Sequence, residues 1–115
     1  MARLIYHVCK RAEWEAARVS GSYAGSSQDA ADGFMHFSGA EQVVASAAKH
    51  RTGQRDLVII EVDSDSLGPA LRWEPSRGGQ LFPHLFGKLP VSAVRRVAPL
   101  PLGHDGRHVF PWGLA

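Results

Sequence analysis

Three apolar runs in the first half of the chain predict β-strands. They are Arg3–Val8, Gly33–Ser38 and Asp56–Asp63, each rich in branched or aromatic side chains and followed by small or polar residues. The third run contains an unbroken apolar stretch from Leu57 to Ile60. Because strands that are covered on both faces show such continuous stretches, we expect this strand at the centre of a sheet.

Between these runs the apolar period changes and predicts two helices. Residues 10–19 place Trp14 at helical spacing with apolar neighbours, and Gly21 suits the end of that helix. Ser38 followed by Glu41 matches a capping box, so we expect a second helix to start directly after the second strand and to end near residues 51–53. The small, polar stretch between the first helix and residue 32 predicts a loop.

The second half of the chain predicts short strands and little helix. Leu71–Glu74 and Gln80–Phe86 flank a turn that contains Gly78 and Gly79, which is the pattern of a hairpin. Pro83 cannot donate a backbone hydrogen bond, so it predicts that the second of these segments is an edge strand or is bent. We expect a one-turn helix near residue 91.

The order β-α-β-α-β, followed by short strands, predicts an α+β fold with two main helices. With 115 residues, 44% of them apolar and 21% charged, the chain fits one ordered domain over residues 1–115. We expect a last strand over residues 94–100 and then a tail. Val109, Phe110 and Trp112 make this tail apolar, so we expect it to dock on the body.

Charge and cysteine content exclude some classes of protein. The formal net charge is +2, and basic pairs such as Lys10–Arg11 and Arg95–Arg96 are scattered, which favours a solvated surface over a nucleic-acid-binding face. Cys9 is the one cysteine, so no intramolecular disulfide can form, and we expect a reducing, cytoplasmic location. No run has the ~20 apolar residues of a membrane-spanning helix, and none is typical of a signal peptide.

The second predicted strand carries the first candidates for chemistry. Strand alternation puts Phe34, His36 and Ser38 on one face, and Met35 and Phe37 on the opposite face, which we expect to be the core face. His36 and Ser38 would then meet solvent or a cleft. The alternative is that Ser38 only caps the following helix and that His36 is a hydrogen-bonded structural histidine.

Two further histidines lie in predicted strands. His7 interrupts an apolar strand, so it either needs a hydrogen-bond partner in the core or serves as a donor to a ligand. In the predicted hairpin, Glu74 and His84 would come close, and a carboxylate beside an imidazole fixes its tautomer for acid–base work. His104 and His108 lie in a segment with no predicted helix, so we expect no metal site there.

Several blocks of the sequence resemble one known family. The order and spacing of these blocks over residues 3–100 are similar to those of the bacterial family called domain of unknown function 952, and the tail over residues 101–115 lies outside the resemblance. The blocks are Ile5–His7, Gly33–Ser38, Asp56–Val58, Leu71–Pro75 and Leu81–Gly87. The resemblance implies no activity. It does imply a compact ADP-ribosyltransferase-like fold, in which a split, mostly antiparallel sheet opens into a cleft for NAD.

The resemblance to the wider fold also implies roles for single residues. A histidine of the first strand typically holds the adenosine ribose, and His7 is the matching position. An aromatic ring stacks on nicotinamide, and Tyr23 and Phe34 are the alternatives here. RNA 2′-phosphotransferases of this fold carry a His-x-Ser pattern that is similar to the one formed by His36 and Ser38.

The glutamate and arginine positions match the wider fold less fully. Its transferases often polarise the ribose with a late glutamate, for which Glu61 and Glu74 are candidates, although neither lies in a matching motif. The phosphotransferases need several arginines, and Arg72 is the one arginine within a matched block.

Three hypotheses follow. The first is an NAD- or nucleotide-handling enzyme, the second is a module that binds a small anion without catalysis, and the third is a small protein-interaction module. The enzyme hypothesis takes His36, Glu74 and His84 as catalytic candidates, and His7, Tyr23, Phe34, Ser38 and Arg72 as ligand-binding candidates. If His7, His36 and His84 converge in the structure, the first two hypotheses stand; if they lie apart, both fail.

Overall fold

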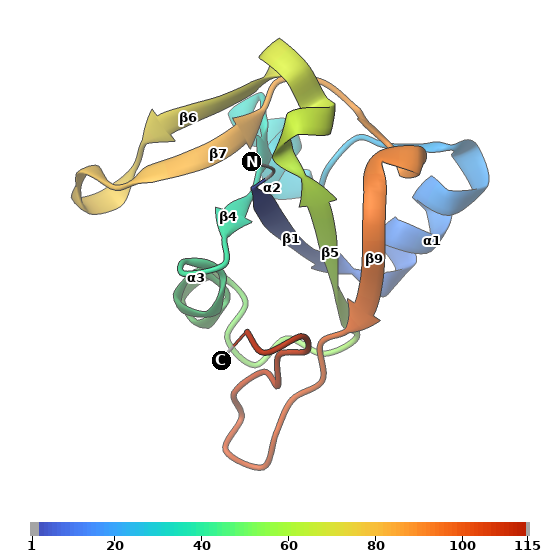
Figure 1. Cartoon of the computed structure of the whole chain (residues 1–115). Coiled ribbons are helices and arrows are strands. Elements are labelled where there is room, and N and C mark those ends of the chain that lie inside the picture. The colour runs from blue at the N-terminus through green and yellow to red at the C-terminus, as the bar shows by residue number, and fades with distance from the viewer. Residues whose placement is uncertain (1–2, 115) are drawn as a thin grey trace.

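Figure 1 shows the computed structural model, which describes residues 3–114. The predicted domain range of 1–115 also includes Met1, Ala2 and Ala115, which lie outside the described residues. The helices are α1 (Arg11–Ser20), α2 (Ser27–Asp32) and α3 (Val43–His50). The strands are β1 (Leu4–Lys10), β2 (Ser22–Tyr23), β3 (Met35–His36), β4 (Ser38–Gly39), β5 (Leu57–Asp63), β6 (Leu71–Pro75), β7 (Leu81–Leu85), β8 (Leu89–Pro90) and β9 (Val94–Pro99). Short 3₁₀ turns cover residues 64–70, 77–79 and 91–93.

The strands form three antiparallel sheets. One has the order β4-β1-β5-β9, one has the order β3-β7-β6, and β2 pairs with β8 in a short ribbon. In Figure 1 the β6–β7 hairpin reaches out on one side of the body and α1 lies on the other, while β9 is an edge strand of the four-stranded sheet. The predicted α+β class and the expected antiparallel pairing are confirmed at this level. None of the helices in residues 3–114 is long and apolar enough to cross a membrane.

Strand β5 is the central element that the sequence predicted. It pairs with β1 along its whole length, from Leu57 opposite Lys10 to Asp63 opposite Leu4, and with β9 on its other side. Its side chains from Leu57 to Val62 are all buried. Ile60 belongs to one apolar cluster and Ile59 to a second, so the two faces of this strand contribute to two separate parts of the core.

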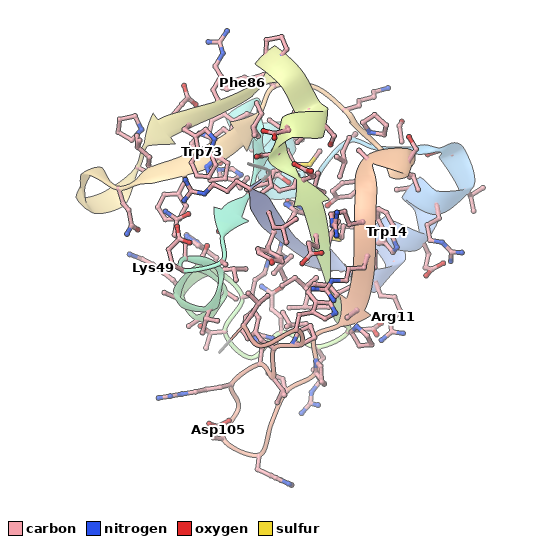
Figure 2. The ribbon with its side chains drawn as sticks, in the orientation of Figure 1. Arg11, Trp14, Lys49, Trp73, Phe86 and Asp105 are labelled. Atoms are coloured by element: carbon pink, nitrogen blue, oxygen red, sulfur yellow. The ribbon has the colours of Figure 1, made fainter. Side chains whose placement is uncertain are left out.

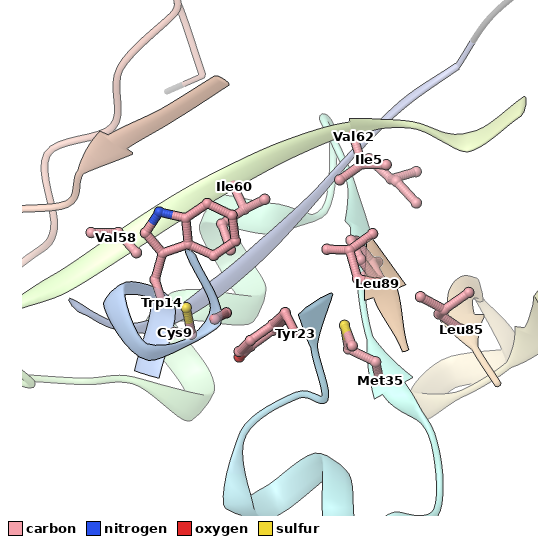
Figure 3. Packing of buried hydrophobic residues seen from close by; sticks show 12 residues of the cluster. Ile5, Cys9, Trp14, Tyr23, Met35, Val58, Ile60, Val62, Leu85 and Leu89 are labelled. Atoms are coloured by element: carbon pink, nitrogen blue, oxygen red, sulfur yellow. The ribbon is translucent and has the colours of Figure 1, made fainter. Parts of the chain in front are cut away.

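The first apolar cluster packs around Tyr23, the one aromatic residue of the predicted loop. Figure 3 shows its ring between Trp14 and Cys9 on one side and Met35 on the other. The loop prediction for residues 21–32 is wrong, because this stretch contains β2 and α2. A capping box forms α2: Ser26 Oγ accepts from the Asp29 backbone at 3.3 Å, and the Asp29 carboxylate accepts from the Ser26 backbone at 2.8 Å.

The predicted end of the first helix is correct, and the predicted start of the helix after the second strand is wrong. Helix α1 ends as predicted at Gly21, whose φ of 90° lies in the left-handed region that glycine favours. The predicted capping box at Ser38 does not form, since Ser38 pairs with Tyr6 in β4 and α3 begins only at Val43. Glu41 instead forms an ion pair with Arg3 at 2.9 Å.

The second predicted strand is divided between two sheets. Its first half, β3, pairs with β7, and its second half, β4, pairs with β1. Phe37 lies between the two halves with its ring in the core, and its N–H donates to the Pro83 carbonyl at 3.0 Å. This division is where the four-stranded sheet separates from the three-stranded sheet.

The predicted hairpin forms, but the first of the two alternatives for its second strand, an edge position, is wrong, and a bend at Pro83 stays a prediction. Strand β7 is the middle strand of its sheet and not an edge. Strand β3 ends at His36, which lies opposite His84, so at Pro83 that side of β7 meets only the N–H of Phe37. A carbonyl satisfies this donor, and the missing N–H of Pro83 therefore does not disturb the ladder there.

The tail docks on the body through Leu114 and through two of the three apolar residues named in the prediction. Phe110 and Trp112 pack on the second cluster, and the Arg96 guanidinium lies 4.2 Å from the centre of the Trp112 ring. The prediction is wrong for Val109, which is exposed, because residues 102–108 fold into a small bridged loop that projects into solvent. Asp105 marks the tip of this loop in Figure 2.

Candidate functional site

The three-stranded sheet carries three basic side chains in one cross-strand row. Strand register places His36 of β3 opposite His84 of β7, and His84 opposite Arg72 of β6. Neighbouring strands lie about 4.8 Å apart, so the row spans roughly 10 Å. Met35 and Leu85 alternate with these residues and point to the core. The row therefore lies on the face of the sheet that points away from the core.

His36 lies between two carboxylates at the open end of this row. Its Nδ1 is 2.5 Å from Asp29 Oδ1, and its Nε2 is 3.1 Å from Asp32 Oδ2. When the ring is protonated, it can donate from both nitrogens at once, one to each carboxylate. Its side chain is 40% exposed, so the imidazole reaches solvent.

Asp29 is fixed on all sides. One oxygen accepts from the backbone N–H and the Nδ1 of His36, and the other accepts from the backbone N–H and hydroxyl of Ser26. Burial alone would raise the pKa of Asp29, but hydrogen bonds from His36 and Ser26 hold that pKa well below its usual range. Asp29 is therefore a permanent anion that orients the imidazole.

His7 lies directly beneath this pair. Its Nδ1 donates to the His36 carbonyl at 2.6 Å, and its Nε2 accepts from the Tyr23 hydroxyl at 2.9 Å. Burial lowers the pKa of His7, although Asp29 and the His36 carbonyl act in the opposite direction. A neutral ring with both nitrogens bonded supports the backbone of His36 from below and offers no free nitrogen to a ligand.

His84 is the second histidine with its own carboxylate. Its Nδ1 lies 2.8 Å from Glu74 Oε1, and because a carboxylate accepts, Nδ1 carries the proton. Nε2 is then the acceptor of the neutral ring. The side chain of His84 is only 8% exposed, because Phe34 stacks on it with the ring centres 4.2 Å apart. The predicted approach of Glu74 and His84 is confirmed.

Aromatic rings and an arginine complete the face. The Phe34 ring also lies 4.6 Å from the His36 ring and 5.3 Å from the Phe86 ring. Phe86, labelled in Figure 2, follows the end of β7, and the guanidinium of Arg72 lies 5.3 Å from the centre of its ring. Within residues 3–114 the guanidinium of Arg72 forms no ion pair, whereas those of Arg3 and Arg96 do. Arg72 is thus an uncompensated cation opposite His84, with His36 at the other end of the row.

The three histidines converge, which is the condition that the sequence left open. His36 and His84 have ring centres 5.6 Å apart, and His7 bonds to the backbone of His36. Ser38 does not share their face, because the strand divides at Phe37 and Ser38 is buried in the four-stranded sheet. The expectation that His36 and Ser38 face one cleft is therefore wrong, and a ligand contact by Ser38 stays a prediction.

The sequence analysis did not identify Asp29, Asp32 or Phe86 as residues of the site. A signal for Asp29 was present in the Ser26-x-x-Asp29 spacing, which is a capping box within a polar stretch. Asp32 lies four residues before His36, but the pairing depends on where α2 ends. Phe86 gave no local signal, because its neighbour Phe34 is distant in the sequence.

The site is an open face and not a deep pocket. Two shallow hollows lie elsewhere: one of about 390 Å³ lies beside Arg3 and Trp73, and one of about 320 Å³ lies between Trp14 and Val97. The histidine face is the better candidate site, because it combines titratable side chains with a cation and aromatic rings, which the hollows do not. Among the described residues, no group of three or more His, Cys, Asp or Glu side chains is arranged so that it could hold a metal ion.

Comparisons with known proteins identify relatives but no activity. A family model described as a protein of unknown function, DUF952, matches residues 8–97. The crystal structure of protein CC0527 from Caulobacter crescentus has 49% identity over 92% of this chain and 93% of its own, with a TM-score of 0.89. The solution structure of the same protein has 50% identity over 90% of each chain, with a TM-score of 0.82. Among curated proteins nothing matches.

Proposed function

The chain belongs to the DUF952 family, and we propose that it is an acid–base enzyme acting on a nucleotide-like phosphate ester. His84 and His36 are the pair that transfers protons. The observation that carries this proposal is the 5.6 Å separation of two imidazole rings, each oriented by its own carboxylate. A phosphoryl group can contact both rings at once over that separation.

The two histidines are suited to opposite tasks. His84 has its proton on Nδ1, toward Glu74, so Nε2 is ready to take a proton from an attacking hydroxyl group. The protonated ring of His36 can donate to both carboxylates, and its Nε2 can give a proton to the leaving oxygen. A new bond forms between phosphorus and the attacking oxygen while the bond to the leaving oxygen breaks, and one proton moves at each end.

Arg72 and the aromatic rings favour a nucleotide-like substrate. Arg72 offers an unpaired guanidinium for phosphate, and Phe86 with Phe34 offers flat faces for a base. The antiparallel split sheet supports the ADP-ribosyltransferase-like assignment, with NAD as a ligand to test. Since both nitrogens of His7 are bonded inside the protein, we assign His7 a positioning role.

Thermal unfolding with candidate ligands tests this proposal. NAD, ADP-ribose and 2′-phosphorylated nucleotides are the probes, and a ligand at 100 times its dissociation constant stabilises by about 2.7 kcal/mol. We expect His36→Ala to abolish the stabilisation and the exposed His104→Ala to retain it. The absence of stabilisation by every probe would contradict the proposal, as would a full response of the His36→Ala protein.

A second candidate function is ligand binding without catalysis. The observation that favours it is that His36 has both nitrogens at carboxylates and His84 is largely covered by Phe34. In that case the same ligands stabilise the protein but no phosphate ester is turned over. Release of phosphate or transfer of a phosphoryl group, lost in His84→Ala, distinguishes the enzyme from the binding module.

A further inference from the structure

The hydroxyl of Tyr23 bonds to a buried histidine of the first strand. Tyr23 is 2% exposed and His7 is 4% exposed. Tyr23 Oη lies 2.9 Å from His7 Nε2, and the two rings meet edge to face with their centres 5.3 Å apart. The other ring nitrogen, Nδ1, lies 2.6 Å from the His36 carbonyl, which can only accept a hydrogen bond. His7 Nδ1 therefore carries a proton, and the charge of the ring depends on Nε2 alone.

The Asp29 carboxylate faces the same nitrogen of His7. Its Oδ2 lies 3.8 Å from Nε2, and both side chains are almost fully buried. The titratable and charged groups around the His7 ring are Tyr23 of β2, Asp29 of α2, His36 of β3 and Arg51 at the end of α3. Asp29 is the anion among them, so it is the group that would favour a positive His7 ring.

Tyr23 and Asp29 require opposite states of Nε2. A bond from the Tyr23 hydroxyl requires a bare nitrogen and a neutral ring, whereas a bond to the Asp29 carboxylate requires a proton there and an imidazolium. The distance of 2.9 Å to the hydroxyl is that of a hydrogen bond, and 3.8 Å to the carboxylate is not. Burial lowers the pKa of His7, which also favours the neutral ring. The Asp29 carboxylate is thus left with its four hydrogen bonds from Ser26 and His36.

We propose that Tyr23 is a positioning residue that donates to His7 Nε2 and thereby reserves the Asp29 carboxylate for His36. This inference rests on the proposed function, because His36 is one of the two residues that transfer protons there. Without the hydroxyl, Nε2 faces the Asp29 carboxylate, and His7 takes up a second proton more readily. Asp29 is then shared between two imidazolium rings, and its hold on His36 Nδ1 weakens.

The ring nitrogen resonances of His7 and His36 test this, with inorganic phosphate as the ligand probe. The proteins are wild type, Tyr23→Phe and, as the matched control, Tyr6→Phe. Tyr6 is also a buried tyrosine, 4% exposed, and its hydroxyl bonds to Glu61 at 3.0 Å. It precedes His7 in β1 and points to the opposite face of that strand. Both variants therefore lose one buried hydroxyl, and only Tyr23→Phe loses the bond to His7.

In wild type at neutral pH, His7 should carry a proton on Nδ1 and none on Nε2. In Tyr23→Phe, His7 should take up its second proton at a higher pH than in wild type, and the Nδ1 resonance of His36 should move. Phosphate binding should weaken by about two- to tenfold, the range of one hydrogen bond. Tyr6→Phe should keep the wild-type resonances of both histidines and the wild-type affinity.

A wild-type His7 ring with protons on both nitrogens at neutral pH would overturn the inference, and this result decides it even if Tyr23→Phe does not fold. Unchanged resonances of His7 and His36 in Tyr23→Phe would also overturn it, because any loss of binding would then come from packing. If wild type binds phosphate and Tyr23→Phe binds it equally well, the inference fails and the proposed function stands. If wild type does not bind phosphate, the proposed function fails and the inference fails with it.

Discussion

Two regions of the molecule each hold a buried carboxylate, and they use it differently. Glu61 of β5 is 1% exposed and accepts from Tyr6 at 3.0 Å and from Arg96 at 2.9 and 3.1 Å. Burial alone would raise the pKa of Glu61, but Arg96 and Tyr6 hold it below its usual range. Asp29 is held as an anion in a similar way, by His36 and Ser26 in place of an arginine and a tyrosine.

The partners decide what each region can do. An arginine stays protonated, and burial together with the bond to Glu61 raises the pKa of Tyr6 to about 12, so the Glu61 cluster exchanges no proton near neutral pH. Trp112 of the docked tail lies against the Arg96 guanidinium. The Asp29 cluster instead ends in an imidazole that reaches solvent. The Glu61 cluster, whose groups keep their protonation states, stabilises the fold. The Asp29 cluster contains a histidine that reaches solvent, so it can do acid–base chemistry.

Removal of Glu61 is expected to have the largest effect on stability. Glu61→Ala leaves the Tyr6 hydroxyl and two arginines without their acceptor, and a broken buried pair costs about 3 kcal/mol. Urea unfolding measures the loss, and Glu61→Gln, which keeps an acceptor, should lose less. The response of His36 to phosphate should remain in the folded protein. If that response disappears, the Glu61 cluster and the site at His36 do not act independently.

Asp29→Asn should weaken the fold by about 2 kcal/mol, because it removes a charged acceptor of four hydrogen bonds. Since folding lowers the pKa of Asp29, its contribution is present above the unfolded value near 4 and is lost as the pH falls. Unfolding curves at neutral and acid pH measure this. The gap between wild type and variant should close in acid, and a gap independent of pH would contradict the account.

His7→Gln should change the pH dependence more than the stability at neutral pH. Burial lowers the pKa of His7, so the unfolded chain takes up the proton first as the pH falls below about 6.5. Wild type should then lose stability with a slope of up to about 1.4 kcal/mol per pH unit that the variant lacks. Melting temperatures between pH 7 and pH 5 provide the check. Parallel curves for the two proteins would show that His7 is not buried in its neutral form.

Arg72→Ala should have the smallest effect on stability, about 0.5 kcal/mol or less, because the side chain is exposed and unpaired. It should weaken phosphate binding about tenfold through the loss of a charge-assisted contact. Arg107→Ala, in the exposed tail loop, is the matched control and should bind phosphate as wild type does. Equal binding by both variants would remove Arg72 from the proposed site.

Local patterns predicted part of the fold and of the candidate site. The continuous apolar stretch of β5 and the glycine turn between β6 and β7 are signals within a few residues, and they gave the central strand and the approach of Glu74 to His84. The division of one strand at Phe37 depends on two partners far away in the sequence. Strand alternation alone therefore put Ser38 on the wrong face.

The short polar helix α2 could not be recognised from apolar periodicity, because it buries almost no apolar side chain of its own. The Ser26–Asp29 capping box was its one local signal. The pairing of Asp29 and Asp32 with His36 depends on where that helix ends. It could therefore not be predicted from the sequence alone.

The most direct test of the central claim is a titration with ADP-ribose in which the ring nitrogen resonances of all six histidines are recorded. If His36 and His84 form one ligand site, their resonances move together with a single dissociation constant, and those of the exposed His104 stay in place. Movement confined to His104 and His108, or no movement of His36 and His84 at any concentration of ligand, would contradict the account.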